Sequence, residues 1–494
     1  MSGVVRGGPV VREPAADASS HFEMVVGLEV HVQLKTATKA FCGCSAAYGA
    51  PPNTNVCPVC LALPGALPVL NAHAVELATR AALALDCTVH PVSIFARKHY
   101  FYPDLPKGYQ ISQYDRPLAT GGAVTVGGRT VRITRVHLEE DAGKSIHDRV
   151  PWGSAIDLNR AGVPLIEIVS EPDIRSAAEA GQYLRALKQT MAYAGVSDVN
   201  MEEGSLRVDA NVSARPRGAT KLGTKTEVKN LNSFSNVERA LAAEFARQCE
   251  LLDRGGDARV EQQTMLWDAA RGAVRPARSK EESHDYRYFP EPDLAPLVVA
   301  DEWVASIRAG LPELPAARRA RYAATYGLSA QEIEPLVDDP DLGRYFEALA
   351  AAHGDAKASA NWVLADVLAT LNASGGDVAR FPLAPTRLAG VLDLVRQGTV
   401  SRTAAKAVFA AMLAGGEEAA ADVAARLGLV QVGDDAMLER WVDEVLAENP
   451  SEAGRYLAGE RKLQGPLVGL VMKKSKGRAD PKRVNQLLAK RSGG

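Results

Sequence analysis

The stretch GLEVHVQLK, residues 27–35, alternates apolar side chains with Glu29, His31 and Gln33. Successive side chains of a β-strand point to opposite faces. The pattern therefore predicts a strand with one apolar face and one face that carries a carboxylate beside an imidazole. The charged face of a lone strand usually contacts solvent, so this segment becomes informative only because others repeat its design.

Four further segments show the same division between an apolar and a polar face. The polar positions are Arg135, His137 and Glu139 in 132–140; Glu167 in 165–169; Arg207, Asp209, Asn211 and Ser213 in 206–213; and Lys225, Glu227 and Lys229 in 224–229. Mg²⁺ prefers hard oxygen ligands and shares substrate phosphates with them. We therefore expect an α+β fold with an antiparallel sheet whose polar face binds a nucleotide and a metal.

Length and composition indicate a globular protein of two to four domains. The chain has 494 residues, of which 46% are hydrophobic and 23% charged. No apolar run reaches the roughly 18 residues of a membrane span, and residues 1–21 resemble a disordered leader rather than a signal peptide. We expect a cytoplasmic protein. Its net charge of −2 means that a nucleic acid would need a local basic patch.

Four of the six cysteines are close together in the sequence. Cys42 and Cys44 precede Cys57 and Cys60 by twelve residues. Disulfides are disfavoured in a chain without an export signal. Paired cysteines at this spacing predict a structural zinc site, because four thiolates fill a tetrahedral coordination sphere. A redox pair or a chance cluster is the alternative.

Helix-capping signals and a change in composition predict the domain organisation. Asn71, Ser176 and Ser235 are expected to begin helices of the first domain, and Ser329 with Glu332 forms a capping box. From about residue 299 the chain becomes Ala-rich and helical. We expect a leader (1–21), a cradle domain (22–298) with the cysteine cluster (42–60), a helical domain (299–414) and a helical tail (415–494).

The tail carries many more bases than acids near its end. After Arg461 the sequence has Lys473, Lys474, Lys476, Arg478, Lys482, Arg483, Lys490 and Arg491, against one acid, Asp480. Such a patch can simply be solvated. On a near-neutral protein, however, it favours a phosphate backbone as ligand.

One nucleotide-binding motif can be rejected. Gly143-Lys144-Ser145 resembles the end of a P-loop, but the position five residues before Gly143 holds Leu138 instead of glycine. A nucleotide would therefore be held by the sheet and its metal.

The same stretches resemble the B-subunit family of the aspartyl/glutamyl-tRNA(Asn/Gln) amidotransferases. The motifs that carry this resemblance are GLEVHVQLK (27–35), YFYPD (100–104), YQISQ (109–113), LEEDAGKS (138–145), DLNR (157–160), LIEIVSEPDI (165–174), MEEGSLR (201–207), KNLNSF (229–234) and DYRYFPEPD (285–293). The likeness runs from about residue 22 to the end of the chain. It implies a cradle similar in fold to glutamine synthetase and the guanidino kinases, followed by a tRNA-binding tail.

The resemblance also implies a reaction and partners. Members are carbon–nitrogen ligases that use ATP and Mg²⁺ to phosphorylate the side-chain carboxylate of Glu on tRNA(Gln) or Asp on tRNA(Asn). Ammonia from an amidase partner, the A subunit, then displaces the phosphate, and a small C subunit joins the two others in a heterotrimer. Since the only adjacent serines are Ser19 and Ser20, the serine pair of amidases has no place in this chain.

Matching motifs carry roles over to particular residues. Glu29, His31 and Glu140 are expected to bind Mg²⁺ or adjoin it, as is Glu139. The strand-face pattern adds Glu203, Arg207, Asp209 and Lys229 as further catalytic candidates on the same polar face. The nucleotide-binding candidates are Lys98, Tyr102, Asn159, Arg160 and Ser205. A structural ion pair is the alternative for each residue taken alone.

Two other functions are open at this point. The archaeal paralogue of the family carries an inserted domain, for which this chain has no room between cradle and tail. A non-catalytic tRNA-binding scaffold with a vestigial sheet is the second alternative.

Overall fold

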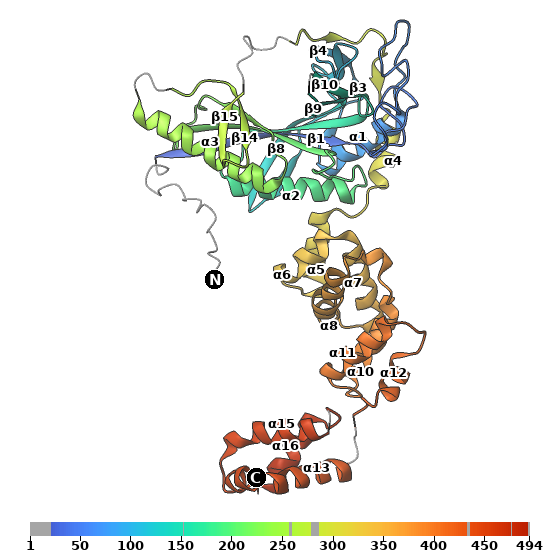
Figure 1. The fold of residues 1–494 in the computed structure, drawn as a ribbon, viewed down its shortest axis with the longest axis vertical. Coiled ribbons are helices and arrows are strands. Elements are labelled where there is room, and N and C mark those ends of the chain that lie inside the picture. Colours follow the sequence, from blue (N-terminus) through green and yellow to red (C-terminus); the bar gives the residue numbers. More distant parts are fainter. Residues whose placement is uncertain are drawn as a thin grey trace. The chain divides into compact units, whose positions relative to one another are not determined.

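The structure is a computed structural model that describes residues 21–151, 153–255, 259–277, 286–431, 435–475 and 477–492. The expected leader, apart from His21, lies outside these residues, as does Lys476. The chain divides into two compact units between Pro315 and Ala316 (Figure 1). The predicted boundary at 298/299 marks the change in composition, whereas this division lies one helix further along, after α4 (Asp301–Ala309).

A ten-stranded sheet forms the centre of the first unit. In spatial order its strands are β15 (Ala273–Pro276), β14 (Thr264–Asp268), β13 (Thr226–Lys229), β12 (Leu206–Pro216), β1 (Phe22–Gln33), β11 (Pro164–Ser170), β8 (Arg129–Glu140), β6 (Ala119–Thr120) and β2 (Thr88–Val89), with β7 (Ala123–Val126) also paired to β8. The predicted strand 27–35 is thus a central strand, β1, that pairs on both edges.

The expectation of a purely antiparallel sheet was wrong at one pair. β13 and β14 run parallel, and the other pairs of this sheet are antiparallel. A parallel pair needs a long crossover connection. Here the chain between the two strands contains helix α3 (Phe234–Arg254), so the fold is α+β with a mixed sheet.

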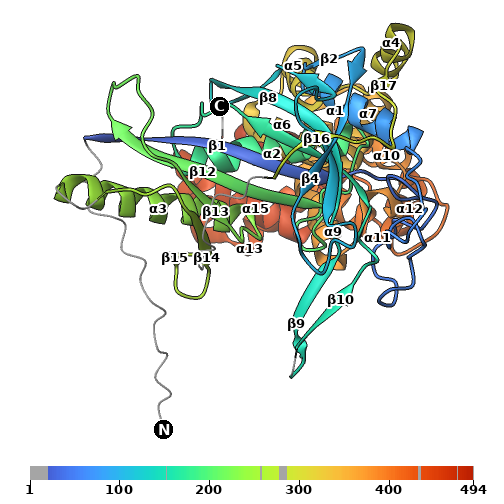
Figure 2. The ribbon, with the colours of Figure 1, turned by 90° about the horizontal axis from the view of Figure 1, so that it is seen from above.

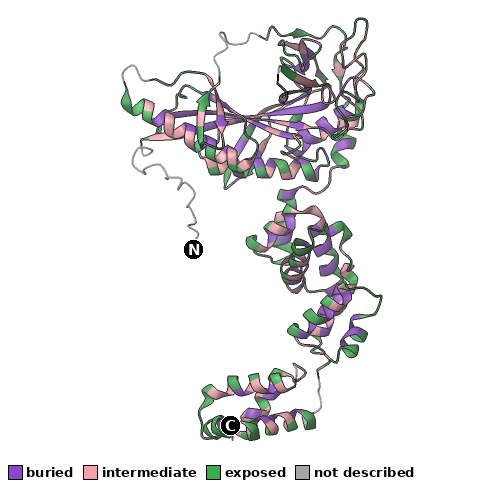
Figure 3. Ribbon diagram, in the orientation of Figure 1, coloured by how far each residue is buried: buried purple, intermediate pink, exposed green. Residues whose placement is uncertain are grey.

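Three helices pack against the apolar face of the sheet, as α2 and α3 show in Figure 1. They are α1 (Ala72–Ala84), α2 (Ala177–Tyr193) and α3. Asn71 and Ser176 cap α1 and α2 as predicted, but Ser233 rather than Ser235 caps α3. Val30, Val32 and Ile166 of the strands are completely buried beneath these helices, and Figure 3 shows the buried residues along the sheet.

Smaller sheets lie outside the ten-stranded sheet, and strand β5 (Tyr109–Gln113) of one of them contacts the end of β8. β16 (Phe289–Pro290), β4 (Phe95–His99) and β5 form a three-stranded sheet, and β3 (Val92–Ser93) pairs with β17 (Leu297–Val298). The hairpin of β9 (Lys144–Val150) and β10 (Gly153–Asp157) extends away from the large sheet (Figure 2).

The described residues of the second unit form helices and no strands. These are α5 (Pro315–Tyr326), α6 (Ala330–Asp338), α7 (Pro340–His353), α8 (Ala356–Trp362), the π-helix η2 (Val363–Val367), α9 (Leu368–Ser374), η3 (Val378–Arg380), α10 (Pro385–Arg396), α11 (Arg402–Leu413), α12 (Ala420–Arg426), α13 (Asp435–Glu448), α14 (Pro450–Leu457), η4 (Arg461–Leu463), α15 (Gln464–Lys474) and α16 (Pro481–Arg491). The box of Ser329 and Glu332 caps α6 as predicted. Among all described helices, none is both long and apolar enough to span a bilayer.

Candidate metal centre

Strand pairing sets four polar side chains in a row across the sheet. His31 on β1 lies opposite Glu167 on β11, and Glu167 lies opposite His137 on β8. On the other edge of β1, His31 lies opposite Arg207 on β12. Opposite residues of an antiparallel pair project to the same face. We call this side of the sheet, with Glu29, Arg135 and Glu139 on the same strand faces, the floor.

Three side chains of the floor converge closely enough to hold one ion. His31 Nε2 lies 3.4 Å from Glu167 Oε2 and 3.6 Å from Glu139 Oε1. One ligand atom from each of the three residues lies within 4.8 Å of the other two. The Glu139 and Glu167 carboxylates are only 2% and 7% exposed. Burying two carboxylates side by side is unfavourable unless positive charge compensates them, so the cluster suits a divalent cation.

Neighbouring opposite charges stabilise the ionised forms of the residues in this cluster. Burial opposes ionisation, but a hydrogen bond with His31 and the charges of His137 and Lys98 hold the pKa of Glu167 far below its usual value. A hydrogen bond with His137 similarly lowers the pKa of Glu139 against the effect of burial. Burial would lower the pKa of His31, yet Glu167 and Glu139 raise it. The carboxylates are therefore held as anions.

Cations and unused donors surround the cluster. Arg135 Nη2 lies 3.9 Å from Glu167 Oε1, and Arg207 Nη2 lies 2.8 Å from Asp141 Oδ2. Burial would lower the pKa of Lys98, but the charges of Glu139 and Glu167 raise it. The Lys98 ammonium therefore interacts electrostatically with both carboxylates of the cluster. Within the described chain, Nε of Arg135, Nε of Arg207 and Nδ1 of His137 are buried without a hydrogen-bond partner. Buried nitrogens without a hydrogen-bond partner are unusual in folded proteins, and the two arginine Nε atoms are donors.

A second polar group lies further along β1 and β12. Asn211 Nδ2 donates to Glu29 Oε1 over 3.0 Å, and Lys229 Nζ lies 3.3 Å from Asp209 Oδ2. Burial first, and then the charge of Glu167, raises the pKa of Glu29. A hollow of about 300 Å³ adjoins Glu29 on this face, with Asn211, Ser213 and Lys225 in its lining. The hollow extends the floor beyond the metal cluster.

Glu140 occupies a different environment from Glu139. Glu140 Oε1 accepts a hydrogen bond from the Ile111 backbone N–H over 2.9 Å and forms an ion pair with Lys107. The three residues that converge on one another are therefore His31, Glu139 and Glu167, rather than Glu29, His31 and Glu140. Since adjacent strand residues alternate between faces, only one of the two acids can follow His137 onto the floor.

Several other predicted site residues lie in loops. Glu203 is exposed in the turn before β12, which begins at Leu206, so the strand-face argument for it was wrong. Asn159 bonds Asn55 N and Pro51 O of the cysteine segment, and Arg160 donates to the carbonyls of Ala142 and Gly143.

The remaining two predicted nucleotide-binding residues also lie outside the sheet. Ser205 Oγ hydrogen-bonds the backbone of Asn200, and Tyr102 is half-exposed beside Tyr100. Asn159, Arg160 and Ser205 hydrogen-bond to neighbouring loop residues in this structure. Their role in nucleotide binding stays a prediction.

Three residues at or beside the floor, Glu167, His137 and Asp141, were not among the predicted ligands or catalytic groups. Glu167 and His137 had been placed on the polar face by alternation alone, and this was the available signal. Asp141 follows the last residue of β8 and accepts hydrogen bonds from Gln33 as well as Arg207. The motif LEEDAGKS (138–145) contains Asp141, but the alternation that assigns side chains to a strand face ends before it.

The four predicted zinc ligands do converge. One sulfur from each of Cys42, Cys44, Cys57 and Cys60 lies within 4.8 Å of the others, and none of the four forms a disulfide. Four sulfurs with this spacing fit a tetrahedral site. We call residues 42–60 the knuckle.

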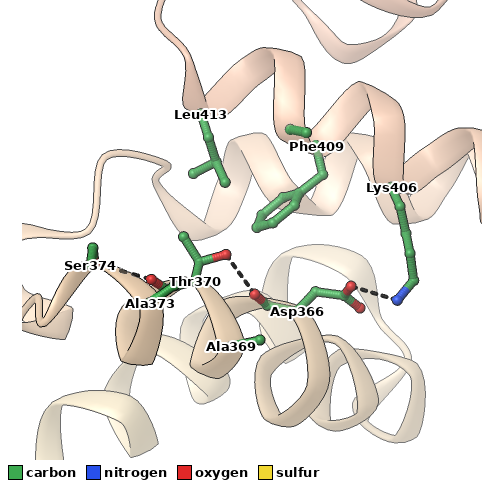
Figure 4. A pocket seen from close by; sticks show the side chains of 9 residues that line it. Asp366, Ala369, Thr370, Ala373, Ser374, Lys406, Phe409 and Leu413 are labelled. Carbon is green, nitrogen blue, oxygen red and sulfur yellow. Dashed lines mark hydrogen bonds and ion pairs between the residues drawn. The ribbon is translucent and has the colours of Figure 1, made fainter.

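The second unit holds another hollow, of about 560 Å³, between the η2–α9 segment and α11 (Figure 4). The charged side chains in its lining are Asp366 and Lys406, which form an ion pair at 2.7 Å. Small and apolar residues, including Phe409 and Leu413, line the rest. This arrangement lacks the converging acids and bases that a catalytic site needs.

The basic tail is partly neutralised within its own unit. Lys474 pairs with Glu444 and Glu448 of α13, and Arg491 pairs with Asp443 over 2.8 Å. These acids precede Arg461 in the sequence, so counting charges along the tail alone missed them. A phosphate-binding role for the tail stays a prediction.

Two family models match this chain, one within each unit apart from the boundary region. Residues 24–305 match the GatB/GatE catalytic domain, and residues 344–491 match the GatB domain. An aspartyl/glutamyl-tRNA(Asn/Gln) amidotransferase B subunit of Chlorobium chlorochromatii is 52% identical over 95% of this chain and 99% of its own length. Those of Geobacter sulfurreducens and Moorella thermoacetica are 52% and 53% identical, with the same coverage. The similarity therefore includes the floor, the knuckle and the tail.

Proposed function

The chain belongs to the family of aspartyl/glutamyl-tRNA(Asn/Gln) amidotransferase B subunits, and from this premise we propose that its floor activates the carboxylate of a misacylated tRNA with ATP. The observation that supports this most is the convergence of His31, Glu139 and Glu167 within the matched catalytic domain. The activated substrate would be Asp on tRNA(Asn), Glu on tRNA(Gln), or both.

The chemistry requires activation because a carboxylate resists attack by ammonia, its oxygen being a poor leaving group. A side-chain carboxylate oxygen takes the γ-phosphoryl group of ATP, the bond to the β-phosphate breaks, and an acyl phosphate and ADP result. Ammonia then attacks the acyl carbon, phosphate leaves, and the amide of Asn or Gln remains on the tRNA. Phosphoryl transfer depends mainly on alignment and on neutralising charge at the phosphate oxygens.

The donor set of the floor fits Mg²⁺. Glu139 and Glu167 would hold it through oxygen, with His31 beside them, and the bound ion would neutralise phosphate charge. Lys98, Arg135 and Arg207 surround these ligands, and the unused Nε donors of the two arginines offer hydrogen bonds to an anion. The chain's own cations would thus orient the phosphates.

The nucleotide would lie across the floor toward the hollow at Glu29. The ion pair of Asp209 and Lys229 lies on the same strand faces as Glu29. The ion pair of Glu140 and Lys107 is not part of this face. Lys98 is the nucleotide-binding candidate that the electrostatics connect to the floor. For Tyr102, Asn159, Arg160, Ser205 and Glu203 the proposal rests on the family motifs alone.

The proposal also includes the structural relatives of the cradle, the partner subunits and a structural zinc ion. The cradle would be related to glutamine synthetase and the guanidino kinases. The A and C subunits would complete a cytoplasmic heterotrimer in which the amidase supplies ammonia, and the helical tail would bind tRNA. Zinc in the knuckle would be structural, because four sulfurs leave no open position.

Reconstitution with the A and C subunits tests the proposal. We expect ATP-dependent amide formation on at least one of Asp-tRNA(Asn) and Glu-tRNA(Gln), and no glutaminase activity from this chain alone. The E167Q variant should lose transfer and keep its affinity for tRNA. Unchanged transfer by E167Q would favour the scaffold function, and robust glutaminase turnover by the isolated chain would contradict the division of labour.

A further inference from the structure

A fully buried lysine lies against the knuckle. Lys39 has no exposed surface, and its ammonium donates three hydrogen bonds. The acceptors are the Asn55 carbonyl at 2.7 Å, the Leu158 carbonyl at 3.3 Å and the Cys60 sulfur at 3.6 Å. An ammonium has three N–H donors, so these contacts use all of them.

The charge of Lys39 is not balanced by a carboxylate. In the part of the chain that the structure describes, no Asp or Glu oxygen lies within ion-pair distance of its Nζ. An isolated buried charge is strongly unfavourable unless it is paired. The one acceptor among its three partners that can carry a full negative charge is the sulfur of Cys60, as a thiolate.

We propose that Lys39 is a positioning residue for the knuckle, which holds the Cys60 thiolate for a bound zinc ion and ties it to the loop at Leu158. Zn²⁺ with four thiolates has a net charge of −2. The Lys39 ammonium reduces this to −1 within a buried site. Groups that hydrogen-bond to metal ligands in this way orient them and tune their affinity for the metal.

The contacts of Lys39 also connect the knuckle to the floor. Leu158 begins the loop that leads into β11, the strand of Glu167. In this loop Gly162 donates to the Asp141 carbonyl over 2.9 Å and accepts from Ala40 N over 2.8 Å. A Cβ at Gly162, whose φ is +87°, would lie 3.5 Å from Lys39 Cδ, 3.7 Å from Cys60 Cβ and 3.8 Å from Glu140 Oε2. Knuckle, loop and the end of β8 therefore meet at one point.

The variant K39M tests this role, with K35M as its matched control. Methionine keeps the apolar stem and removes the ammonium. Lys35 lies four residues earlier, is exposed, and pairs with Asp198 at the surface. Competition with a chelator should show about 10- to 100-fold weaker zinc binding in K39M. With Co²⁺ in place of zinc, the sulfur-to-cobalt charge-transfer band should shift in K39M and stay unchanged in K35M.

The outcomes separate this inference from the zinc proposal on which it rests. Wild-type protein that binds no zinc would overturn both. Wild-type protein that binds zinc, with K39M equal to it in affinity and cobalt spectrum, would overturn the role of Lys39 alone.

A second measurement covers the case in which K39M does not fold. Removing zinc from wild-type protein should speed amide hydrogen exchange at residues 158–163, and unchanged exchange there would overturn the link.

Discussion

Two clusters of the molecule have donor atoms close enough together to hold a metal ion, and they differ in donor type, in origin along the chain and in surroundings. The knuckle presents four sulfurs from one short segment, whereas the floor gathers an imidazole and two carboxylates from three strands far apart in sequence. Soft sulfur ligands suit zinc, and hard oxygen ligands suit Mg²⁺. On the proposed function, the donor atoms would favour Mg²⁺ at the floor and zinc at the knuckle.

The two clusters also differ in whether the neighbouring hydrogen-bonding groups have partners. At the knuckle the neighbouring donors are used, as the three hydrogen bonds of Lys39 show. At the floor, Arg135, Arg207 and His137 keep buried nitrogens without partners among the described residues. A complete set of contacts is typical of a structural site, while unused donors are typical of a site completed by a substrate.

The largest expected effect is at the floor. E139Q keeps the shape of the side chain but removes a negative charge from the cluster. We expect the rate of ATP-dependent transfer by the reconstituted complex to fall about 10²- to 10³-fold, as when a major electrostatic group of an active site is removed. Affinity for tRNA should stay unchanged. E76Q, which alters a half-buried ion pair on α1 away from the floor, serves as the control, and normal transfer by E139Q would contradict the distinction between the clusters.

A ligand change at the knuckle should act on zinc first and on transfer less. C57S replaces one of the four sulfurs with a poor zinc ligand. We expect the bound zinc to be lost, the melting temperature to fall by several degrees, and transfer to fall by about 10-fold or less, since the metal there does not touch substrate. Metal analysis, thermal denaturation and transfer rates would measure this. A loss of transfer as large as that of E139Q would contradict a purely structural knuckle.

The partly buried carboxylate of Glu332 in the second unit, which belongs to neither cluster, should give a smaller effect. Lys357 and Ser329 lower the pKa of Glu332 from 4.5 to about 2. A carboxyl whose pKa falls on folding stabilises the protein above its unfolded pKa and loses that effect as the pH falls through the folded value. E332Q should therefore lower the free energy of unfolding by about 1 kcal/mol at neutral pH, the usual value of a helix cap. Urea denaturation should show this difference shrinking between pH 4.5 and 2, and a constant difference would contradict it.

Much of the floor could be predicted from alternation alone. Period-two patterns placed Glu29, His31, His137, Glu167 and Arg207 on one face, and strand pairing confirms this arrangement. The choice between Glu139 and Glu140 shows how two kinds of inference can differ. The family motif favoured Glu140 for the metal, whereas alternation from His137 favoured Glu139, and the structure groups Glu139 with His31.

Other features left no local signal. The parallel pairing of β13 with β14 depends on where the chain returns after α3, which residue patterns do not encode. No residue pattern marks Lys39 as buried, because only the packed knuckle and the Leu158 loop cover it. The acids of α13 that pair with the tail were far from it in sequence.

Anomalous scattering from crystals grown with Mn²⁺ and a non-hydrolysable ATP analogue would locate the divalent ion proposed for the floor. We expect a manganese peak bound by Glu139 and Glu167 beside His31, with no peak at Glu140 and Lys107. A peak at Glu140, or none on the floor when the nucleotide is bound, would contradict the account.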